Sequence, residues 1–358
     1  MNSSISNSSF TVIDMTEPKV SVCMPIYNSA PYLAQAIESV LMQSYKDFEL
    51  LIVDDCSTDG SAAIAGNYVG RDSRIRLQIN PVNRGMVGNW NYCLEQARGE
   101  YVHFMFGDDY FISPEAISLK VKALNEHPDV SIVSSSRQVV DENGNFITVW
   151  QGFRDLESAN PRHVAQACLK LYHLVDGTLK FGCLENFIGE PSAVMFRKTE
   201  AGHGFSFEYK QLVDLEMWFR LLAKGRFSFF SEPLIAFRRH DAQQTAKNSK
   251  DFVHIEEYLA LIKQYVSFAY PLFIPPLSTF VVMSECYRIT NLQKRDAIFS
   301  EEVASSSVTR VISPAAFKLM WPFYRLLQPF YKIFIKLFSP LFTSYYRIMP
   351  VDGGTSIK

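Results

Sequence analysis

The sequence lacks the features that would tie it to nucleic acid, to a disulfide framework or to secretion. Its formal net charge is −2, so it has no basic excess with which to neutralise a phosphate backbone. The six cysteines show no C-x-x-C spacing, which argues against a zinc site and against structural disulfides, and a reducing compartment fits them best. The first 19 residues have neither a basic region nor an apolar run, so we expect no signal peptide and a cytoplasmic location.

Two nucleotide-handling signatures are also missing. No G-x-G-x-x-G fingerprint follows the first apolar run, which argues against a dinucleotide-dependent oxidoreductase. Residues 25–28 are neither glycine-rich nor basic, which argues against a nucleotidyltransferase that must hold a triphosphate. With 358 residues, 47% of them hydrophobic and 20% charged, the chain can still bury a full core, and we expect one large domain with an appendage.

Short apolar runs that end in polar residues dominate the first third of the chain. They read VSVCMPIYN from residue 20, ELLIVDDCSTDG from residue 49 and YVHFMFGDD from residue 101. We predict strands at residues 19–24, 48–53, 75–79 and 101–106, separated by helices at 31–43, 62–69, 89–97 and 114–127. Such alternation predicts an α/β fold with a mostly parallel central sheet, and ligands of such sheets bind at the carboxyl ends of the strands.

Further elements follow with weaker patterns. We predict a strand at residues 130–140 that opens a hairpin, a helical and loop-like region at 159–189, a strand at 192–197, a helix at 212–224, a closing strand pair at 227–237 and helices at 254–265 and 278–298. The domain boundaries expected from these patterns are a disordered leader at 1–17, the α/β domain at 18–245, a helical extension at 246–302 and a tail at 303–358.

The tail differs in composition from the rest. Residues 303–351 contain no acidic residue and interleave basic with aromatic side chains, a pattern typical of an amphipathic helix at an anionic membrane surface. Four prolines argue against a spanning helix. We therefore expect membrane-surface contact through residues 310–347, at the inner face of the plasma membrane; the alternative is an arm that covers the domain or a partner subunit.

The polar residues at the predicted strand ends suit a nucleotide-sugar and its metal. Tyr27 can lie against a base, and Asp55 can accept a hydrogen bond from a pyrimidine N–H. Asp108 and Asp109 place two carboxylates at one strand end, so that one can reach a ribose hydroxyl and the other a metal that bridges the phosphates. Mg²⁺ and Mn²⁺ favour such oxygen ligands. An acidic pair alone is a weak signal, and its place after the two earlier motifs strengthens it.

These motifs together resemble the family 2 glycosyltransferases of the GT-A, Rossmann-like fold. The resemblance rests on Pro25-Ile26-Tyr27-Asn28, Asp54-Asp55-Cys56-Ser57-Thr58-Asp59-Gly60, Asn83-Arg84-Gly85, Ala97-Arg98-Gly99-Glu100-Tyr101 and Gly107-Asp108-Asp109, and extends more weakly to about His240. It implies inverting transfer of a sugar from a nucleotide diphosphate donor, with UDP favoured. By position it implies that Pro25, Tyr27 and Asp55 bind the donor base, Asp108 the ribose and Asp109 the metal. Asn28 is also expected to contact the donor.

Two positions depart from the family pattern. The family often has an aspartate where this chain has Phe106, so metal binding rests on fewer carboxylates. Many members have an arginine where this chain has Trp90, and the donor contact that this arginine makes is expected to be missing or taken over by Arg84.

A single displacement at an anomeric carbon needs a general base on the acceptor side. The resemblance makes Asp214, at the start of a predicted helix, the candidate base, with Glu216 as its rival. It also implies that His240 completes the metal shell or contacts the diphosphate, and that Gly189 lies in a loop beside the donor sugar, where glycine lets the backbone approach closely.

The alternative from another class is a non-catalytic nucleotide-sugar-binding protein on a degenerate GT-A fold. A processive polymerase of the same family is disfavoured because the chain lacks spanning helices and a Q-x-x-R-W motif. Transfer of one sugar per encounter to a hydroxyl of a glycan or polyprenol-linked acceptor, as in bacterial surface polysaccharide assembly, is therefore the expected function. The donor sugar, the linkage and the oligomeric state stay open.

Overall fold

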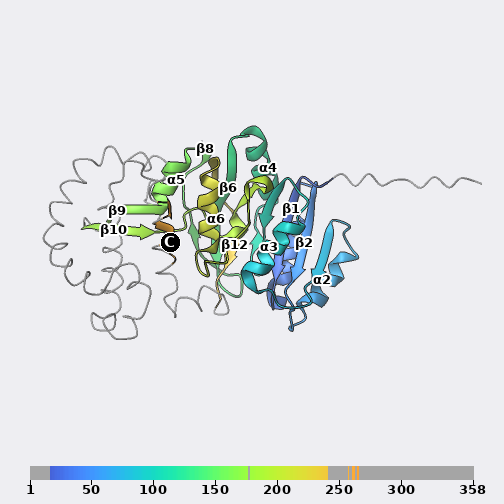
Figure 1. The fold of residues 1–358 in the computed structure, drawn as a ribbon. Coiled ribbons are helices and arrows are strands. Elements are labelled where there is room, and N and C mark those ends of the chain that lie inside the picture. Colours follow the sequence, from blue (N-terminus) through green and yellow to red (C-terminus); the bar gives the residue numbers. More distant parts are fainter. Residues whose placement is uncertain (1–16, 176–177, 241–256, 258–259, 263, 266–358) are drawn as a thin grey trace, which may run out of the picture.

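The computed structural model describes residues 17–175, 178–240, 257, 260–262 and 264–265. The expected leader up to residue 16, most of the helical extension and the whole basic and aromatic tail lie outside the described residues. The described part forms layers of helices on both faces of a central sheet, and a separate two-stranded hairpin projects from one end (Figure 1).

The elements follow one another in the alternating order expected from the sequence. The strands are β1 (Val20–Ile26), β2 (Phe48–Asp54), β3 (Ile75–Ile79), β4 (Tyr101–Phe104), β5 (Tyr110–Phe111), β6 (Val130–Val140), β7 (Phe146–Trp150), β8 (Leu156–Ala159), β9 (Leu169–Val175), β10 (Thr178–Leu184), β11 (Met195–Arg197) and β12 (Arg226–Arg238). The helices are α1 (Ala30–Leu41), α2 (Ser61–Val69), α3 (Gly85–Gln96), α4 (Ala116–Glu126), α5 (Pro161–Cys168) and α6 (Val213–Leu222), with 3-10 turns η1 (Pro191–Ala193) and η2 (Lys198–Glu200).

The central sheet is mixed, with a parallel half and a second half that contains antiparallel pairs. Its order is β3-β2-β1-β4-β11-β6-β12-β5; β3, β2, β1 and β4 are mutually parallel, and β11 then pairs antiparallel with β4 and β6. Because β1, β2 and β4 run in the same direction, their carboxyl ends and the loops that follow meet at one edge of the sheet. The polar residues of all three sequence motifs therefore lie in one region.

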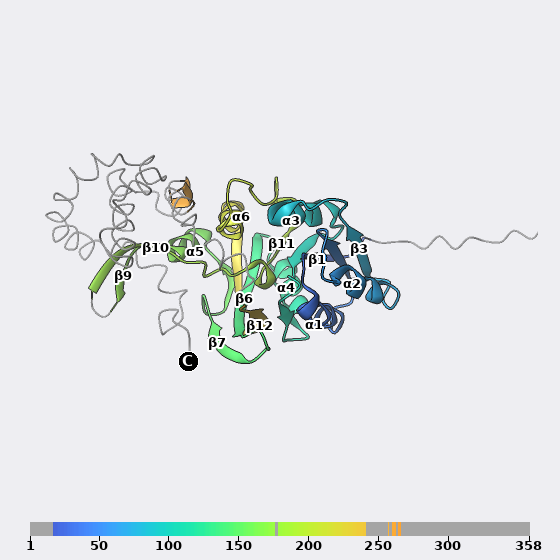
Figure 2. The same ribbon diagram turned by 90° about the horizontal axis from the view of Figure 1, so that it is seen from below.

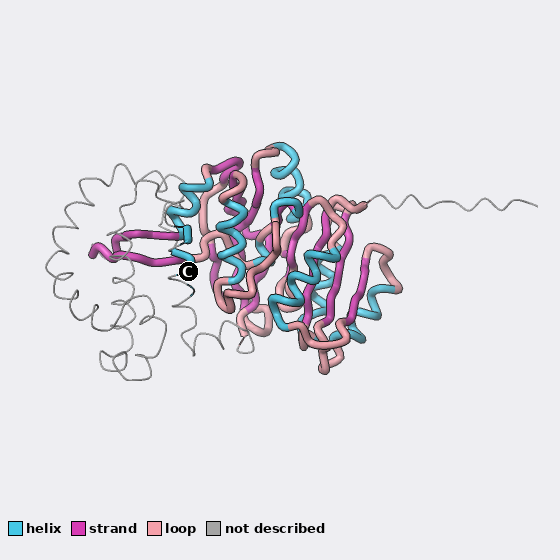
Figure 3. The backbone as a smooth tube through the Cα atoms, in the orientation of Figure 1, coloured by secondary structure: helices cyan, strands magenta, loops and turns pink. Residues whose placement is uncertain are grey.

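Alternating residues of the buried strands face two different helical layers. Cys23, Leu51 and Val53 pack in the core under α3, α5 and α6, whereas Val22, Met24 and Ile52 pack in the core under α1, α2 and α4. Figure 2 and Figure 3 show the sheet between these two layers. This double burial explains why the strands read as continuous apolar runs in the sequence.

Two expectations for the later part of the chain are wrong. The helical and loop-like region expected at 159–189 contains the antiparallel hairpin of β9 and β10, for which the Asp176-Gly177 dipeptide in the sequence is a recognised signal. The strand pair expected at 227–237 is the single strand β12, whose register against β6 shifts on both sides of Pro233. Proline cannot donate to a strand ladder, so the pattern is interrupted there while the strand continues.

Candidate active site

The loops after β1 and β2 are tied together by hydrogen bonds from backbone amides. Asn28 has a positive φ of 51°, and its N–H donates to Ser57 Oγ at 2.9 Å. In return Asn28 Oδ1 accepts from the N–H of Thr58 at 2.9 Å. Asp59 Oδ2 accepts from the N–H of Ala30, at the start of α1, also at 2.9 Å. This mutual bonding fixes the loop that carries the exposed Tyr27.

Asp55 lies at the bottom of this loop pair and is almost fully buried. Its Oδ1 accepts from Asn80 Nδ2 and from the backbone N–H of Arg84, both at 2.8 Å. Its Oδ2 has no hydrogen-bond partner among the described residues, so one carboxylate oxygen can still accept from a ligand N–H. The structure brings Pro25, Tyr27 and Asp55 together as the sequence predicts, with Pro25 buried in β1.

Arg84 is exposed at the start of α3, but its guanidinium already has partners. It lies 4.1 Å from the Tyr92 ring centroid, and its Nε donates to Asn80 Oδ1 at 3.2 Å. Arg84 therefore supports the Asp55 site through its backbone, and its side chain offers a positive charge at the rim of the site.

The adjacent carboxylates Asp108 and Asp109 have opposite environments. Asp109 is 1% exposed, and its Oδ1 accepts from the backbone N–H of Arg238 at 3.0 Å. Burial and the neighbouring Asp108 carboxylate raise the pKa of Asp109 well above its usual range. Asp108 is partly exposed, and its Oδ2 lies 3.0 Å from Nε2 of His240. Of the two adjacent carboxylates, Asp108 is therefore the more exposed and the one that lies beside His240.

Arg238, which the sequence reading did not single out, holds this turn in place. Its Nε donates to the backbone carbonyl of Asp108 at 3.0 Å, and its guanidinium lies 4.5 Å from the Tyr32 ring centroid. The His240 ring also packs against Tyr32, with the two ring centroids 5.3 Å apart. The end of β12 thus brings a cation and an imidazole to the acidic turn after β4.

A second acidic group, apart from the Asp108-Asp109 pair, is Asp214 in the first turn of α6. Its Oδ2 accepts from Asn186 Nδ2 at 2.9 Å, and its Oδ1 accepts from the N–H of Leu215 at 2.7 Å. Burial and the negative charge of Glu190 raise the pKa of Asp214 to about 7, although the side chain keeps some exposure. A carboxylate with this pKa can take up a proton near neutral pH.

Glu190 and Arg137 form an ion pair beside Asp214. Arg137 Nε lies 2.5 Å from Glu190 Oε2, and Arg137 Nη2 donates to the backbone carbonyl of Asn186 at 3.3 Å. Neither residue was assigned a role from the sequence. The signal that could have found Arg137 is its position inside the otherwise uncharged strand run of residues 130–140, where a buried arginine requires a partner.

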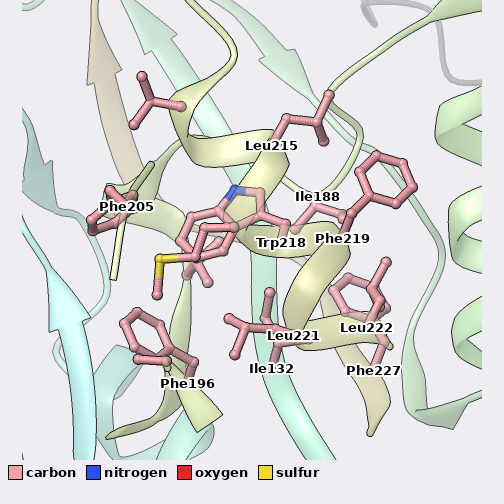
Figure 4. Packing of buried hydrophobic residues seen from close by; sticks show 14 of the residues in the cluster. Ile132, Ile188, Phe196, Phe205, Leu215, Trp218, Phe219, Leu221, Leu222 and Phe227 are labelled. Carbon is pink, nitrogen blue, oxygen red and sulfur yellow. The ribbon is translucent and has the colours of Figure 1, made fainter. Parts of the chain in front are cut away.

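The loop at Gly189 is rigidly held at a positive φ of 120°, which glycine tolerates. Its carbonyl accepts from Trp218 Nε1 at 2.9 Å and from Asn186 Nδ2 at 3.1 Å. Figure 4 shows the Trp218 indole within the apolar cluster of α6, next to Leu215 and Phe205. The Asn186 amide thus joins the loop to Asp214, and the core of the domain positions both.

Glu216, the rival for the role of base, is committed to structural contacts. It is 3% exposed, and both of its carboxylate oxygens accept from Arg220 Nε, at 2.9 and 3.1 Å. The hydroxyl of Tyr265 also donates to it at 3.2 Å. The Glu216 carboxylate is thus paired with a cation, whereas the Asp214 carboxylate accepts from neutral amides.

The two acidic centres are physically connected. The backbone N–H of Phe106, between β4 and Asp108, donates to Ser192 Oγ at 3.2 Å, and Ser192 belongs to the 3-10 turn that follows Glu190.

In the ranges that the structure covers, no group of three or more His, Cys, Asp or Glu side chains could hold a metal ion without help from a ligand. The helices among the described residues include none with the length and apolarity needed to cross a bilayer.

Comparison with known proteins identifies the family of the chain. The family described as Glycosyl transferase family 2 matches residues 21–181. An uncharacterized protein of Mycobacterium tuberculosis is 34% identical over 244 residues, covering 66% of this chain and 71% of that relative. TuaG of Bacillus subtilis, named for teichuronic acid biosynthesis, is 43% identical over 93 residues, which cover 26% of this chain and 37% of TuaG.

Among solved structures, the fold matches residues 1–349 of TarS from S. aureus in complex with UDP-GlcNAc. The TM-score is 0.56 at 20% identity, with 78% of this chain and 75% of that chain covered. The α/β fold with its mostly parallel sheet is that of the GT-A class. The chain belongs to glycosyltransferase family 2, which transfers sugar from nucleotide-linked donors.

Proposed function

We propose that this protein transfers one sugar, with inversion, from a nucleotide diphosphate donor to a hydroxyl group of a glycan or lipid-linked glycan, with Asp214 as general base. The observation that carries the proposal is the Asp214 carboxylate, whose pKa of about 7 and amide contact with Asn186 suit proton transfer. As the acceptor oxygen bonds to the anomeric carbon, its proton passes to Asp214 and the bond to the nucleotide diphosphate breaks.

On the donor side, Tyr27 and Asn28 border the base, and the free Oδ2 of Asp55 accepts from a pyrimidine N–H, which favours UDP. Asp108 and His240 would hold Mg²⁺ or Mn²⁺, because a partly exposed carboxylate and an imidazole 3.0 Å apart leave the remaining ligand positions to the donor phosphates. The ion would neutralise the charge of the departing diphosphate.

The acceptor class rests on weaker support. The name of TuaG points to cell-surface polysaccharide assembly, and the basic and aromatic segment at 310–347 suits a protein that meets its acceptor at an anionic membrane surface. That segment lies outside the described residues, so membrane contact stays a prediction from the sequence.

Thermal unfolding with a panel of UDP, GDP, dTDP and their sugar conjugates, with and without Mn²⁺, tests the donor site. We expect one nucleotide class to raise the melting temperature in the presence of Mn²⁺, because a ligand that binds only the folded state stabilises it. The Mn²⁺-dependent part of the shift is expected to disappear in Asp108→Asn and to persist in the matched variant Asp109→Asn. The reverse pattern would return the metal to Asp109, and no shift with any nucleotide would overturn the proposal.

A non-catalytic nucleotide-sugar-binding protein is the competing function. The raised pKa of Asp214 favours the enzyme, since a site that only binds a donor gains nothing from a carboxylate poised to accept a proton.

A further inference from the structure

An aromatic pair interrupts the polar edge of the site. Trp90 on α3 and Phe106 after β4 stack with ring centroids 4.9 Å apart and an interplanar angle of 28°. Both side chains are partly exposed. Phe106 precedes Asp108 by two residues, and Trp90 lies on α3, which begins after Arg84, whose backbone N–H donates to Asp55. The pair therefore joins the segments that carry the proposed base-binding and metal-binding residues.

The pair is anchored from the core side. Trp90 meets the ring of Phe205 edge-on at 5.1 Å and lies 6.5 Å from that of Phe104, both of which are buried. The N–H of Phe106 donates to Ser192 Oγ, in the segment that continues from Glu190. The position of the pair is therefore fixed on one side by the core and on the other by the loop that serves Asp214.

The two rings occupy the two positions at which the sequence departs from the family pattern. Because Trp90 and Phe106 contact each other, the two departures form a single change. An apolar pair stands where the family often has an arginine and an aspartate. An arginine or an aspartate at only one of the two positions would face an aromatic ring instead of an oppositely charged partner. Two stacked aromatic rings, in contrast, stabilise each other. An apolar surface kept partly exposed beside a ligand site marks a place where the ligand is apolar.

We propose that Trp90 and Phe106 form an apolar wall of the donor-sugar subsite and select a donor whose sugar carries a methyl group. This inference rests on the proposed function and names its substrate class. The methyl group can come from a 6-deoxyhexose or from an acetamido substituent. One methyl or methylene group in an apolar pocket discriminates between substrates by about tenfold or more, whereas a hydroxyl against the same wall finds no partner.

Binding measurements on the full chain with Mn²⁺ test this with donors matched in nucleotide. The pairs are UDP-glucose with UDP-N-acetylglucosamine, and dTDP-glucose with dTDP-6-deoxyglucose, each compared with the free nucleotide. We expect the methyl-bearing sugar of at least one pair to bind about tenfold more tightly. A preference within the UDP pair identifies the acetamido group, and a preference within the dTDP pair identifies the deoxy sugar.

The variants Trp90→Arg, Phe106→Asp and the double variant test whether the two rings act as one unit. We expect each single variant to lose the preference and the double variant to bind both sugars of a pair within about twofold, while affinity for the free nucleotide is kept in all three. The single losses should not add, as expected for residues in contact. Phe146→Asp, an exposed phenylalanine on β7, is the matched control and should keep the preference.

Phe106→Ala provides a milder variant if Phe106→Asp does not fold, as judged by its thermal transition. It removes the wall without adding a charge, and it should also lose the preference. Equal binding of matched sugars by the wild type, with tight binding of a free nucleotide, would overturn this inference and leave the proposed function intact. Absence of binding by every nucleotide would overturn both.

Discussion

The carboxylates of the loop after β2 and those at the acceptor end of the site have opposite surroundings. In the loop after β2 each acid receives backbone N–H groups: Asp54 from Ser57, Asp55 from Arg84 and Asp59 from Ala30. Burial alone would raise the pKa of Asp59, but hydrogen bonds from Ser61 and Ala30 lower it below its ordinary value. These hydrogen bonds hold the three acids in fixed positions.

At the acceptor end the acids are crowded instead. Arg137 forms an ion pair with Glu190, and burial together with the charge of Glu190 raises the pKa of Asp214 to about 7. This difference in surroundings matches two different roles of carboxylates, ligand recognition and proton transfer. A recognition site is served by acids whose charge is constant, whereas a general base must gain and lose a proton near the working pH.

The largest effect on activity is expected for Asp214→Asn, which tests whether Asp214 transfers a proton. We expect kcat to fall by about 10²-fold to 10⁴-fold, because an amide cannot accept the acceptor proton. Donor affinity, measured by titration with the nucleotide-sugar, should be unchanged. A variant that keeps its turnover would remove Asp214 from the mechanism, and one that loses donor affinity would place Asp214 in the donor site.

The same variant has an opposite effect on stability, which gives a second readout. A buried carboxylate whose folded-state pKa is raised makes the wild type lose stability as the pH rises from about 4 to about 7. Asp214→Asn lacks this loss, so its advantage in melting temperature should grow through that range and stay constant above it. Asp59→Asn is the matched control at the donor end: its lowered pKa means that the substitution should destabilise at neutral pH and less so in acid.

A smaller effect is expected for Glu190→Gln, which removes the charge that crowds Asp214. The pKa of Asp214 should fall, because a neighbouring negative charge disfavours ionisation and the Arg137 charge loses its partner. The acidic limb of the pH profile of kcat should therefore move to lower pH, and the ratio of activity at pH 6 to that at pH 8 should rise. Arg137→Gln should move the limb the opposite way. Unchanged limbs in both variants would mean that another group titrates.

The donor end could largely be predicted from the sequence because its signals are local. The strand ends at Pro25, Asp55 and Asp108 follow continuous apolar runs, and parallel strands bring such ends together. The local sequence does not show how the surroundings of Asp108 and Asp109 differ. Which of two adjacent acids faces solvent depends on the contact of Asp109 with Arg238, 129 residues away, and no local pattern contains it.

The acceptor end was predictable only in part. The resemblance identified Asp214 and the loop at Gly189, but the groups that set the properties of Asp214 come from distant segments. Asn186 and Arg137 contact each other across 49 residues, and the hairpin of β9 and β10 was read as helix and loop. Because a pKa is set by burial and by charges in space, the poised state of Asp214 could not be derived from its sequence neighbours.

The smallest effect is expected for Trp218→Phe, which links the core to the acceptor end. Phenylalanine keeps most of the apolar contacts but cannot donate to the Gly189 carbonyl, and the loss of one buried hydrogen bond costs about 1 kcal/mol. For a domain of this size that corresponds to a fall in melting temperature of about 2–4 °C. Because Asn186 also bonds to Gly189 and positions Asp214, kcat should fall as well, by less than about tenfold. Phe196→Leu is the matched control, because Phe196 packs against Trp218 in the same cluster but makes no hydrogen bond to the Gly189 loop. This variant should lower the melting temperature and leave kcat unchanged. Equal losses of kcat in both variants would mean that the hydrogen bond from Trp218 to Gly189 has no part in positioning the base.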